Sequence, residues 1–352
     1  GRLMVWAVNE NGASKLYGKN LATNTPINMP NLPLGVVNGM VLNPDATKLA
    51  LVYVRPSQAS NLYEVDLATG EMIELGQSML GGIDPADFIE PEAVFYESFD
   101  GRKIPAWLYK PKTVEGMRYP VMLSIHGGPE AQERAIYNYN GLYQYLLNAG
   151  FGILAPNIRG STGYGKSYQK LIHRDWGGAE LRDIEHAALY LRGLDWVDSN
   201  RIAVFGGSIG GFATLSAVTR RPEYWAVGVD VVGPSNLVTF AKAVPPFWRP
   251  IMKAWVGDPD EDYDMLMERS PITYVSQLRA PMLVIQGAKD PRVVQAESDQ
   301  MVEKIRAQGG HVEYYVDEEE GHGATRRENS IKWMSMIARF LEEQLLDLPT
   351  SS

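Results

Sequence analysis

The sequence has no cysteine, few histidines and no long hydrophobic run. Because Cys is 0 among 352 residues, disulfide bonds, a thiolate nucleophile and cysteine-based metal sites are all excluded. The 5 histidines show no paired spacing such as H-E-x-x-H, so no metal site is predicted. No stretch of about 18 apolar residues occurs, and a membrane-spanning helix is therefore not expected.

Positive charge is also scarce. Lys and Arg number 33 against 42 Asp and Glu, which gives a formal net charge of −9. Nucleic acids and anionic membranes both require a basic face, so neither is expected as a partner. The hydrophobic share of 45% and the charged share of 21% predict a globular chain. The apolar run at residues 2–8 is too short for a signal peptide, which favours a cytoplasmic protein.

Residues 1–85 are predicted to be all-β. The pair Leu16-Tyr17 recurs as Leu62-Tyr63, an offset of 46 residues, and short strand-like runs alternate with turns on either side. Such a period is typical of propeller blades, and the segment has room for about two of the roughly 4 to 8 blades that close a ring. Exposed strand edges should result, which a second copy of the chain could pair to form a homodimer. An ordinary small sheet with an accidental repeat is the alternative.

A different pattern begins after a Gly- and Pro-containing linker at residues 78–92. Apolar strands now alternate with amphipathic helices. Strands are predicted at residues 93–99, 103–110, 121–125, 151–156, 201–205, 225–232, 282–286 and 311–316. Nearly continuous apolar strands separated by helices indicate a mostly parallel sheet that is covered on both faces. We therefore expect an α/β-hydrolase fold over residues 86–352.

A glycine-bracketed serine follows the strand at 201–205 and precedes a buried helix. The segment Gly206-Gly207-Ser208-Ile209-Gly210 matches the G-x-S-x-G pattern of a nucleophile elbow. Glycines suit this position because the turn is sharp and neighbouring Cβ atoms would collide. Ser208 is therefore the candidate nucleophile. A glycine-rich turn without chemistry is the alternative.

A nucleophilic serine needs a base and an acid further along the chain. In this fold the order is Ser, then Asp or Glu, then His, and after Ser208 only His311 and His322 remain. His311 opens a strand, whereas His322 lies between two glycines in a loop, so His322 is the predicted base. Asp290 follows the strand at 282–286, at the sheet edge where active sites lie. It is predicted to orient the imidazole. The aspartates at positions 258–264 are poorer candidates because they lie in a segment predicted to be a solvated loop.

Two backbone N–H groups are predicted to form an oxyanion hole. One belongs to Ile209, and the other comes from the loop at 126–129, where we favour Gly128 over Gly127. His126 is predicted to brace this loop. Four aromatic residues are candidates for an apolar acyl pocket, although simple packing is an equally open interpretation: Phe240, Phe247, Trp248 and Trp255.

From about residue 90 to 345 the chain resembles the catalytic domain of the prolyl oligopeptidase family, in particular its acylaminoacyl-peptidase-like bacterial members. The resemblance rests on five motifs: His126-Gly127-Gly128-Pro129, Arg159-Gly160-Ser161-Thr162-Gly163-Tyr164-Gly165, Gly206 to Gly211, Asp290-Pro291-Arg292 and Gly321-His322-Gly323. It implies a triad of Ser208, Asp290 and His322 that works without a cofactor. It also implies that Arg292 binds a carbonyl or carboxylate of the substrate. Residues 1–85 resemble the last two blades of the family's propeller.

Two departures from the family pattern shape the functional expectation. Ile209 replaces the tyrosine that usually follows the serine, and most of the propeller is missing. Both changes favour a carboxylesterase that acts on short acyl esters through an acyl-enzyme. An acylaminoacyl-peptidase or another exopeptidase that acts on short peptides is the alternative. A further alternative, outside the enzymes, is a non-catalytic binding module.

Overall fold

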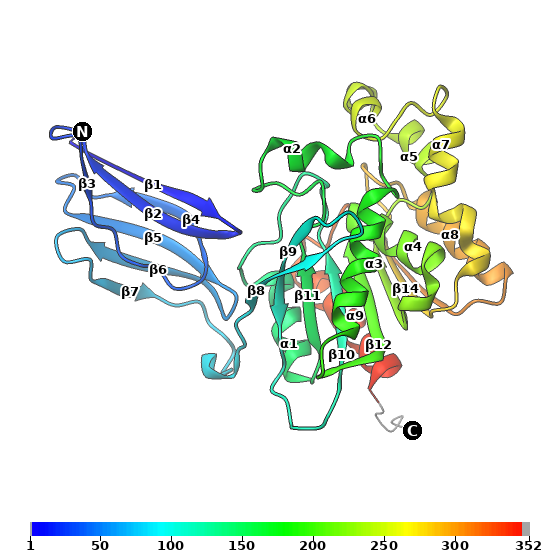
Figure 1. Cartoon of the computed structure of the whole chain (residues 1–352), viewed down its shortest axis with the longest axis horizontal. Helices are drawn as coiled ribbons and strands as arrows, with labels where there is room; N and C mark the ends of the chain where they lie inside the picture. Colours follow the sequence, from blue (N-terminus) through cyan, green and yellow to red (C-terminus); the bar gives the residue numbers. More distant parts are fainter. Residues whose placement is uncertain (1, 347–352) are drawn as a thin grey trace.

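The computed structural model describes residues 2–346 and shows two small sheets beside a large one (Figure 1). The first small sheet is antiparallel and contains β1 (Leu3–Glu10), β2 (Ala13–Asn20) and β3 (Thr25–Ile27). The second contains β4 (Val36–Leu42), β5 (Lys48–Arg55), β6 (Gln58–Asp66) and β7 (Met72–Gly76). The predicted all-β segment with two blade-like units is confirmed.

The sequence repeat corresponds to equivalent strands in these two sheets. Leu16 lies in β2 and Leu62 lies in β6, so the offset aligns β1–β3 with β5–β7. The sheets pack face to face through a small core, in which Leu16 contributes from one sheet and Leu51 and Tyr63 contribute from the other. Alternating side chains of β5 point into this core, as expected for a strand with one buried face.

The segment between β7 and β8 contains only a short 3₁₀ helix, η1 (Pro85–Asp87). The large sheet follows, with the strand order β15-β14-β13-β12-β10-β11-β9-β8. Its strands are β8 (Glu92–Glu97), β9 (Lys103–Tyr109), β10 (Tyr119–Ile125), β11 (Gly152–Pro156), β12 (Val197–Gly207), β13 (Val227–Val231), β14 (Met282–Gly287) and β15 (Val312–Asp317). The pairs β8–β9 and β9–β11 are antiparallel. The other five pairs, from β11–β10 to β14–β15, are parallel, so the predicted mostly parallel sheet is confirmed.

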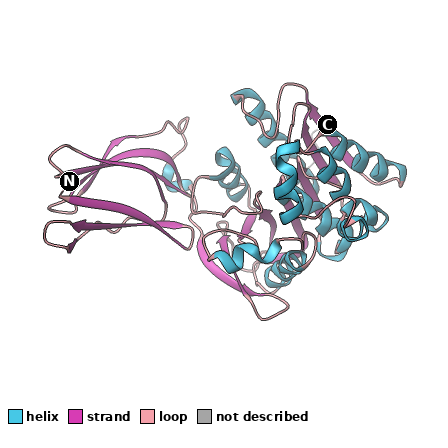
Figure 2. Ribbon diagram, turned by 90° about the horizontal axis from the view of Figure 1, so that it is seen from above, coloured by secondary structure: helices cyan, strands magenta, loops and turns pink. Residues whose placement is uncertain are grey.

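Helices cover both faces of the large sheet, as predicted (Figure 2). The α-helices are α1 (Leu142–Asn148), α2 (Lys166–Gln169), α3 (Ala179–Arg192), α4 (Ile209–Arg220), α5 (Leu237–Ala243), α6 (Arg249–Trp255), α7 (Tyr263–Arg269), α8 (Gln295–Ala307) and α9 (Arg327–Leu345). The further 3₁₀ helices are η2 (Asn138–Gly141), η3 (Lys170–Ile172), η4 (Pro222–Tyr224), η5 (Pro246–Trp248) and η6 (Pro271–Gln277). One core cluster joins the sheet to α3, α4 and α8, and a second joins it to α1 and α9. Within residues 2–346, no helix combines the length and apolar character that crossing a membrane requires.

One short helix differs from the sequence prediction. Residues 258–264 were expected to form a solvated loop, but α7 begins at Tyr263. The side chain of Asp262 accepts a hydrogen bond from the backbone N–H of Asp258 at 2.8 Å, which closes the turn before the helix. Leu266 is fully buried and fixes the helix against the apolar cluster beneath it.

The first small sheet contacts the large domain through the turn between β1 and β2. The Gly12 carbonyl accepts a hydrogen bond from the Ala135 N–H at 3.1 Å, and Asn11 accepts one from the Tyr164 hydroxyl at 3.0 Å. The Asn9 side-chain amide donates to Gln132 at 2.6 Å. These contacts place the N-terminal segment against the chain that continues from the predicted oxyanion loop.

Candidate active site

Ser208 occupies a strained turn between β12 and α4. Its φ of 57° and ψ of −118° lie outside the favoured regions for a residue with a side chain. Such strain persists only where the surroundings impose it, and here they do. A Cβ on Gly210 would lie 2.1 Å from the Ile125 carbonyl oxygen, because the start of α4 packs directly against the end of β10. The glycines therefore permit the close approach that a nucleophile elbow requires.

The three predicted triad residues come together at the carboxyl ends of the parallel strands. His322 Nε2 lies 2.9 Å from Ser208 Oγ, and His322 Nδ1 lies 2.6 Å from Asp290 Oδ2. The other oxygen of Asp290 accepts hydrogen bonds from the backbone N–H groups of Arg292 at 2.8 Å and Val293 at 3.0 Å. The carboxylate is thus held in one orientation and buried, while the imidazole stays partly open to solvent. This geometry suits proton transfer between serine and histidine.

The predicted oxyanion loop lies beside the nucleophile. A Cβ on Gly127 would be 3.6 Å from Ser208 Cβ. His126 Nδ1 donates a hydrogen bond to the Gly127 carbonyl at 2.6 Å. In a trans peptide the carbonyl and the following N–H point in opposite directions, so the Gly128 N–H points away from the imidazole. The N–H of Ile209, at the first turn of α4, directly follows the nucleophile.

His126 lies within the fold and not at the reacting centre. Its Nε2 lies 2.8 Å from Ser161 Oγ, in the loop that follows β11. Burial lowers the pKa of His126, because the charged ring would lose hydration. The Thr162 N–H also donates to the Ala131 carbonyl at 2.7 Å. The loop after β11 therefore braces the oxyanion loop, which agrees with the bracing role that we predict for His126.

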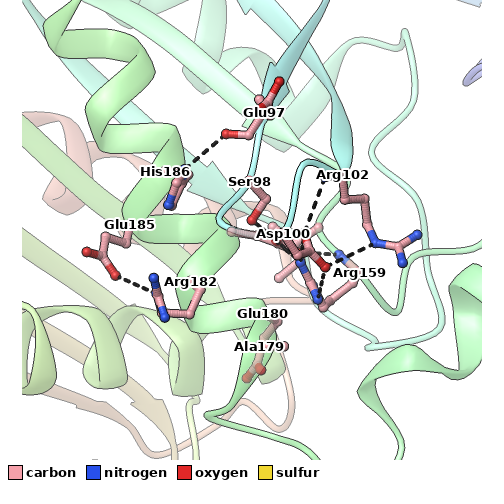
Figure 3. A network of polar contacts seen from close by, with 12 residues as sticks. Glu97, Ser98, Asp100, Arg102, Arg159, Ala179, Glu180, Arg182, Glu185 and His186 are labelled. Carbon is pink, nitrogen blue, oxygen red and sulfur yellow. Dashed lines mark hydrogen bonds and ion pairs between the residues drawn. The ribbon is translucent and has the colours of Figure 1, made fainter.

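The buried side chain of Arg159 anchors the beginning of that bracing loop, and Figure 3 shows it beside Asp100 and Ser98. Arg159 Nε and Nη2 donate to the two carboxylate oxygens of Asp183 at 2.9 Å and 2.7 Å. Asp100 accepts from the same guanidinium at 3.2 Å, and the Ser98 hydroxyl donates to Asp183 at 2.6 Å. The sequence marked Arg159 as part of a motif but gave no partner for it. The structure shows that it ties the β8–β9 turn to α3.

The candidate pocket residues separate into buried and exposed groups. Ile209 and Phe240 belong to one buried apolar cluster, against which Trp248 and Trp255 pack. Phe247, in contrast, is 77% exposed and contributes little to that cluster. Arg292 is exposed, and its guanidinium carbon lies 6.0 Å from the centre of the Trp248 ring. The cluster thus includes the residue that follows the nucleophile.

Sequence reasoning missed Glu320, which lies two residues before His322. Its carboxylate accepts hydrogen bonds from the Thr325 N–H at 2.9 Å, the Arg326 N–H at 3.0 Å and the Asn329 side-chain amide at 2.8 Å. The Thr325 backbone contact is the first of the contacts that lower the pKa of Glu320 to about 2. These bonds tie the His322 loop to the start of α9. No side chain at the N-terminal cap of α9 satisfies the free N–H groups there, and Glu320 supplies their acceptors.

The α/β-hydrolase sheet carries a nucleophile elbow, and a serine, a histidine and an aspartate are hydrogen-bonded in series there. This combination defines the serine hydrolase class. The chain belongs to the prolyl oligopeptidase family, whose model matches residues 137–347, more than half of the chain. The predicted family is thus confirmed.

Two curated relatives are each 37% identical to the chain over the aligned residues. Dipeptidyl aminopeptidase BIII of Pseudoxanthomonas mexicana is 37% identical over 260 residues, which cover 70% of this chain and 37% of that protein. Dipeptidyl peptidase family member 6 of Caenorhabditis elegans is 37% identical over 232 residues, which cover 64% and 31% respectively. The match therefore covers about a third of the length of each of these relatives.

Solved structures of similar fold match nearly the whole chain. A puromycin-hydrolyzing peptidase of Mycobacterium tuberculosis superposes with a TM-score of 0.87 at 24% identity, over 99% of this chain and 53% of that one. The acylaminoacyl peptidase of Pyrococcus horikoshii gives a TM-score of 0.85 at 21% identity, over 99% and 56%. Because these matches cover nearly the whole chain, the two small sheets belong to the shared fold and fit two blades of a propeller.

Proposed function

We propose that this protein is a serine exopeptidase that acts on short peptides through an acyl-enzyme. The observation that carries the proposal is the hydrogen-bonded series from Asp290 through His322 to Ser208 on a strained elbow. Ser208 Oγ attacks the carbonyl carbon while His322 Nε2 takes its proton and then returns it to the leaving amine. Asp290 holds the imidazole in the required tautomer. Water then attacks the acyl-enzyme and releases the acid.

Backbone groups and the apolar cluster complete the proposed site. The N–H groups of Ile209 and Gly128 stabilise the negative charge that develops on the carbonyl oxygen, with Gly127 as the alternative to Gly128. The cluster that contains Ile209, Phe240 and Trp248 receives an apolar side chain of the substrate. Arg292, which is exposed beside Trp248, binds a substrate carbonyl with its forked donors. Phe247 is a rim residue in this arrangement because most of its side chain faces solvent.

The relatives' names favour peptide over ester hydrolysis, although the sequence departures favoured a carboxylesterase. Esterase activity is the second candidate because Ile209 is buried among apolar side chains. An ester also has a better leaving group and needs less precise binding. If the protein is a peptidase, its turnover of dipeptidyl p-nitroanilides should exceed its turnover of p-nitrophenyl butyrate. Ester turnover without any amide turnover would establish the esterase instead.

Covalent labelling tests the catalytic role of Ser208 directly. A fluorophosphonate probe should label the native protein and leave the Ser208→Ala variant unlabelled. Ser335→Ala, which removes an exposed hydroxyl on α9, should be labelled like the native protein. Turnover by Ser208→Ala should fall by roughly five to six orders of magnitude if the triad acts as a unit. A folded native protein that resists labelling would favour the non-catalytic binding module.

We also propose that the two small sheets mediate a homodimer. In the described part of the chain, β1 and β3 edge the first sheet and β4 and β7 edge the second. Val41, Leu62 and Ile73 are exposed on the second sheet. Unpaired edges beside apolar side chains favour association with a second copy. The mass in solution should rise with concentration and should fall back in Leu62→Lys. A monomer mass at every concentration would exclude the dimer.

A further inference from the structure

A buried glutamate outside the triad lies at the end of the segment that carries the predicted oxyanion loop. Glu133 is 5% exposed, and its carboxyl group accepts a hydrogen bond from the side-chain amide of Asn138. Among the residues that the structure describes, no Lys, Arg or His forms an ion pair with it, and the neighbouring guanidinium of Arg134 contacts Ser14 of β2 instead. Glu133 thus lies in the interior without a compensating positive charge.

Tyr143 connects the two ends of this segment. Its hydroxyl donates a hydrogen bond to Ser124 Oγ at 2.6 Å, and Ser124 lies on β10 just before the oxyanion loop begins. The same hydroxyl lies 3.4 Å from Oε1 of Glu133. Ser124 and Glu133 flank residues 125–132, so the oxyanion loop belongs to a bend whose two ends meet at one phenol in the core.

The backbone of Glu133 is fixed by other contacts. Its N–H donates to the Asn157 side-chain oxygen at 2.7 Å, and its carbonyl accepts from the Asn157 side-chain N–H at 3.1 Å. The Trp107 indole donates to the same carbonyl at 3.2 Å. Because Asn157 directly follows β11, the end of the bend is attached to the sheet through main-chain groups. A change in the charge of Glu133 therefore acts on the side chains that face it.

The titratable side chains that face the Glu133 carboxyl group in the described part of the chain are tyrosines. Tyr143 comes from α1, Tyr139 from η2 and Tyr109 from β9. Burial raises the pKa of each hydroxyl, and Glu133 raises it further, so all three stay protonated while Glu133 titrates. Burial also raises the pKa of Glu133 to about 8. The acid is therefore mostly neutral at pH 7 and loses its proton under mildly alkaline conditions.

The Tyr143 hydroxyl has one proton and two acceptors. While Glu133 is neutral, the shorter contact, to Ser124, takes this proton. A buried carboxylate would compete for it, because a hydrogen bond to a charged acceptor is roughly twice as strong as one to a neutral acceptor. Ser124 would then lose its donor at the end of β10 that leads into the oxyanion loop.

We propose that Glu133 is a positioning residue whose neutral form leaves the Tyr143 proton on Ser124, and that its ionisation redirects Tyr143, loosens the oxyanion loop and slows the reaction at Ser208. Glu133 acts through the loop and not on the reacting atoms. The inference rests on the proposed serine hydrolase function and names a group that makes this function depend on pH. The triad itself stays intact when the loop loosens.

The rate at which a fluorophosphonate labels Ser208 tests the role of Glu133, because the probe carries no group that titrates between pH 7 and pH 9. The native rate constant should fall about tenfold over this range, as the neutral fraction of an acid with a pKa of about 8 does. Glu133→Gln has a neutral side chain of the same shape that cannot lose a proton. Its rate constant should therefore change by less than about twofold over the same range.

Tyr143→Phe provides a second variant in case Glu133→Gln does not fold. It removes the shared hydroxyl, so its labelling at pH 7 should already be as slow as native labelling at pH 9 and should not slow further. Tyr109→Phe is the matched control, because the Tyr109 hydroxyl is buried without a hydrogen-bond partner in the range 2–346. Its labelling rate should fall with pH like the native rate.

Two kinds of contrary result are distinguishable. A native rate that does not fall between pH 7 and pH 9, or a fall that persists in Glu133→Gln, would overturn the positioning role of Glu133 alone. A folded native protein that is not labelled at pH 7 would overturn the serine hydrolase function itself.

Discussion

His322 Nδ1 lies 2.6 Å from Asp290 Oδ2, and the other oxygen of that carboxylate is held by two backbone N–H groups. Asp290→Asn should keep the backbone bonds but present an amide to the imidazole, which favours the wrong tautomer. We expect kcat to fall by roughly 10⁴-fold, as the triad template predicts. Steady-state turnover measures this, with Asp264→Asn on the exposed face of α7 as the control. A loss below tenfold would show that Asp290 is not the orienting acid.

Gly210 marks the contact that places the nucleophile. In Gly210→Ala the new methyl group would lie 2.1 Å from the Ile125 carbonyl oxygen, and a backbone atom at the end of β10 cannot move without disturbing the sheet. We expect a loss of about 3 kcal/mol or more in the free energy of unfolding, at the upper end of overpacking costs.

Urea unfolding checks this expectation. Gly76→Ala is the matched control, because nothing lies within 4 Å of its added Cβ. It should leave the free energy of unfolding within about 0.5 kcal/mol of the native value. Near-native stability in Gly210→Ala would mean that α4 can shift away from β10.

The Arg159–Asp183 pair should contribute strongly to stability because it is buried. Asp183→Asn leaves the guanidinium with the partly exposed Asp100 as its remaining counter-charge, and the loss of one partner of a buried pair costs up to about 3–5 kcal/mol. Glu343→Gln breaks an exposed pair with Arg339 on α9 and should change stability by less than about 1 kcal/mol. Denaturant unfolding of both variants gives the comparison. Equal effects would contradict a special role for the buried pair.

The features that the sequence predicted are local or follow chain order. Ser208 was found because its glycines, the strand before it and the helix after it are contiguous. Asp290 and His322 were found because parallel strands bring their carboxyl ends to one edge. The two small sheets were visible from the repeat that links Leu16 and Leu62.

The features that the sequence did not predict depend on tertiary packing. Phe247 and Trp248 are adjacent and chemically similar, yet only Trp248 packs on the apolar cluster, because η5 turns one side chain inward and the other outward. Asp183 lies 24 residues after Arg159 with no periodicity to connect them. Glu320 was indistinguishable from Glu318 and Glu319 in a run of acidic residues. Only its packing against the start of α9 gives it partners.

Glu320 is expected to stabilise the His322 loop in a pH-dependent way. Its pKa is lowered from 4.5 to about 2, with the Thr325 backbone contact as the first cause. A lowered carboxyl pKa stabilises the fold above the unfolded value, and that contribution is lost as the pH falls from about 4.5 towards 2. Glu320→Gln replaces one acceptor oxygen with an amide donor and removes the charge, which should cost about 1–3 kcal/mol at pH 7.

The pH profile separates this role from simple packing. The difference in unfolding free energy between the native protein and Glu320→Gln should be constant at neutral pH and should shrink below about pH 4.5. At pH 7 kcat should fall while fluorophosphonate labelling of Ser208 persists at a slower rate, because the loop that carries His322 loses its attachment to α9. Glu319→Gln, an exposed neighbour, should behave like the native protein in both measurements. A stability difference that is the same at pH 7 and pH 3 would show that the charge of Glu320 is not what holds the loop.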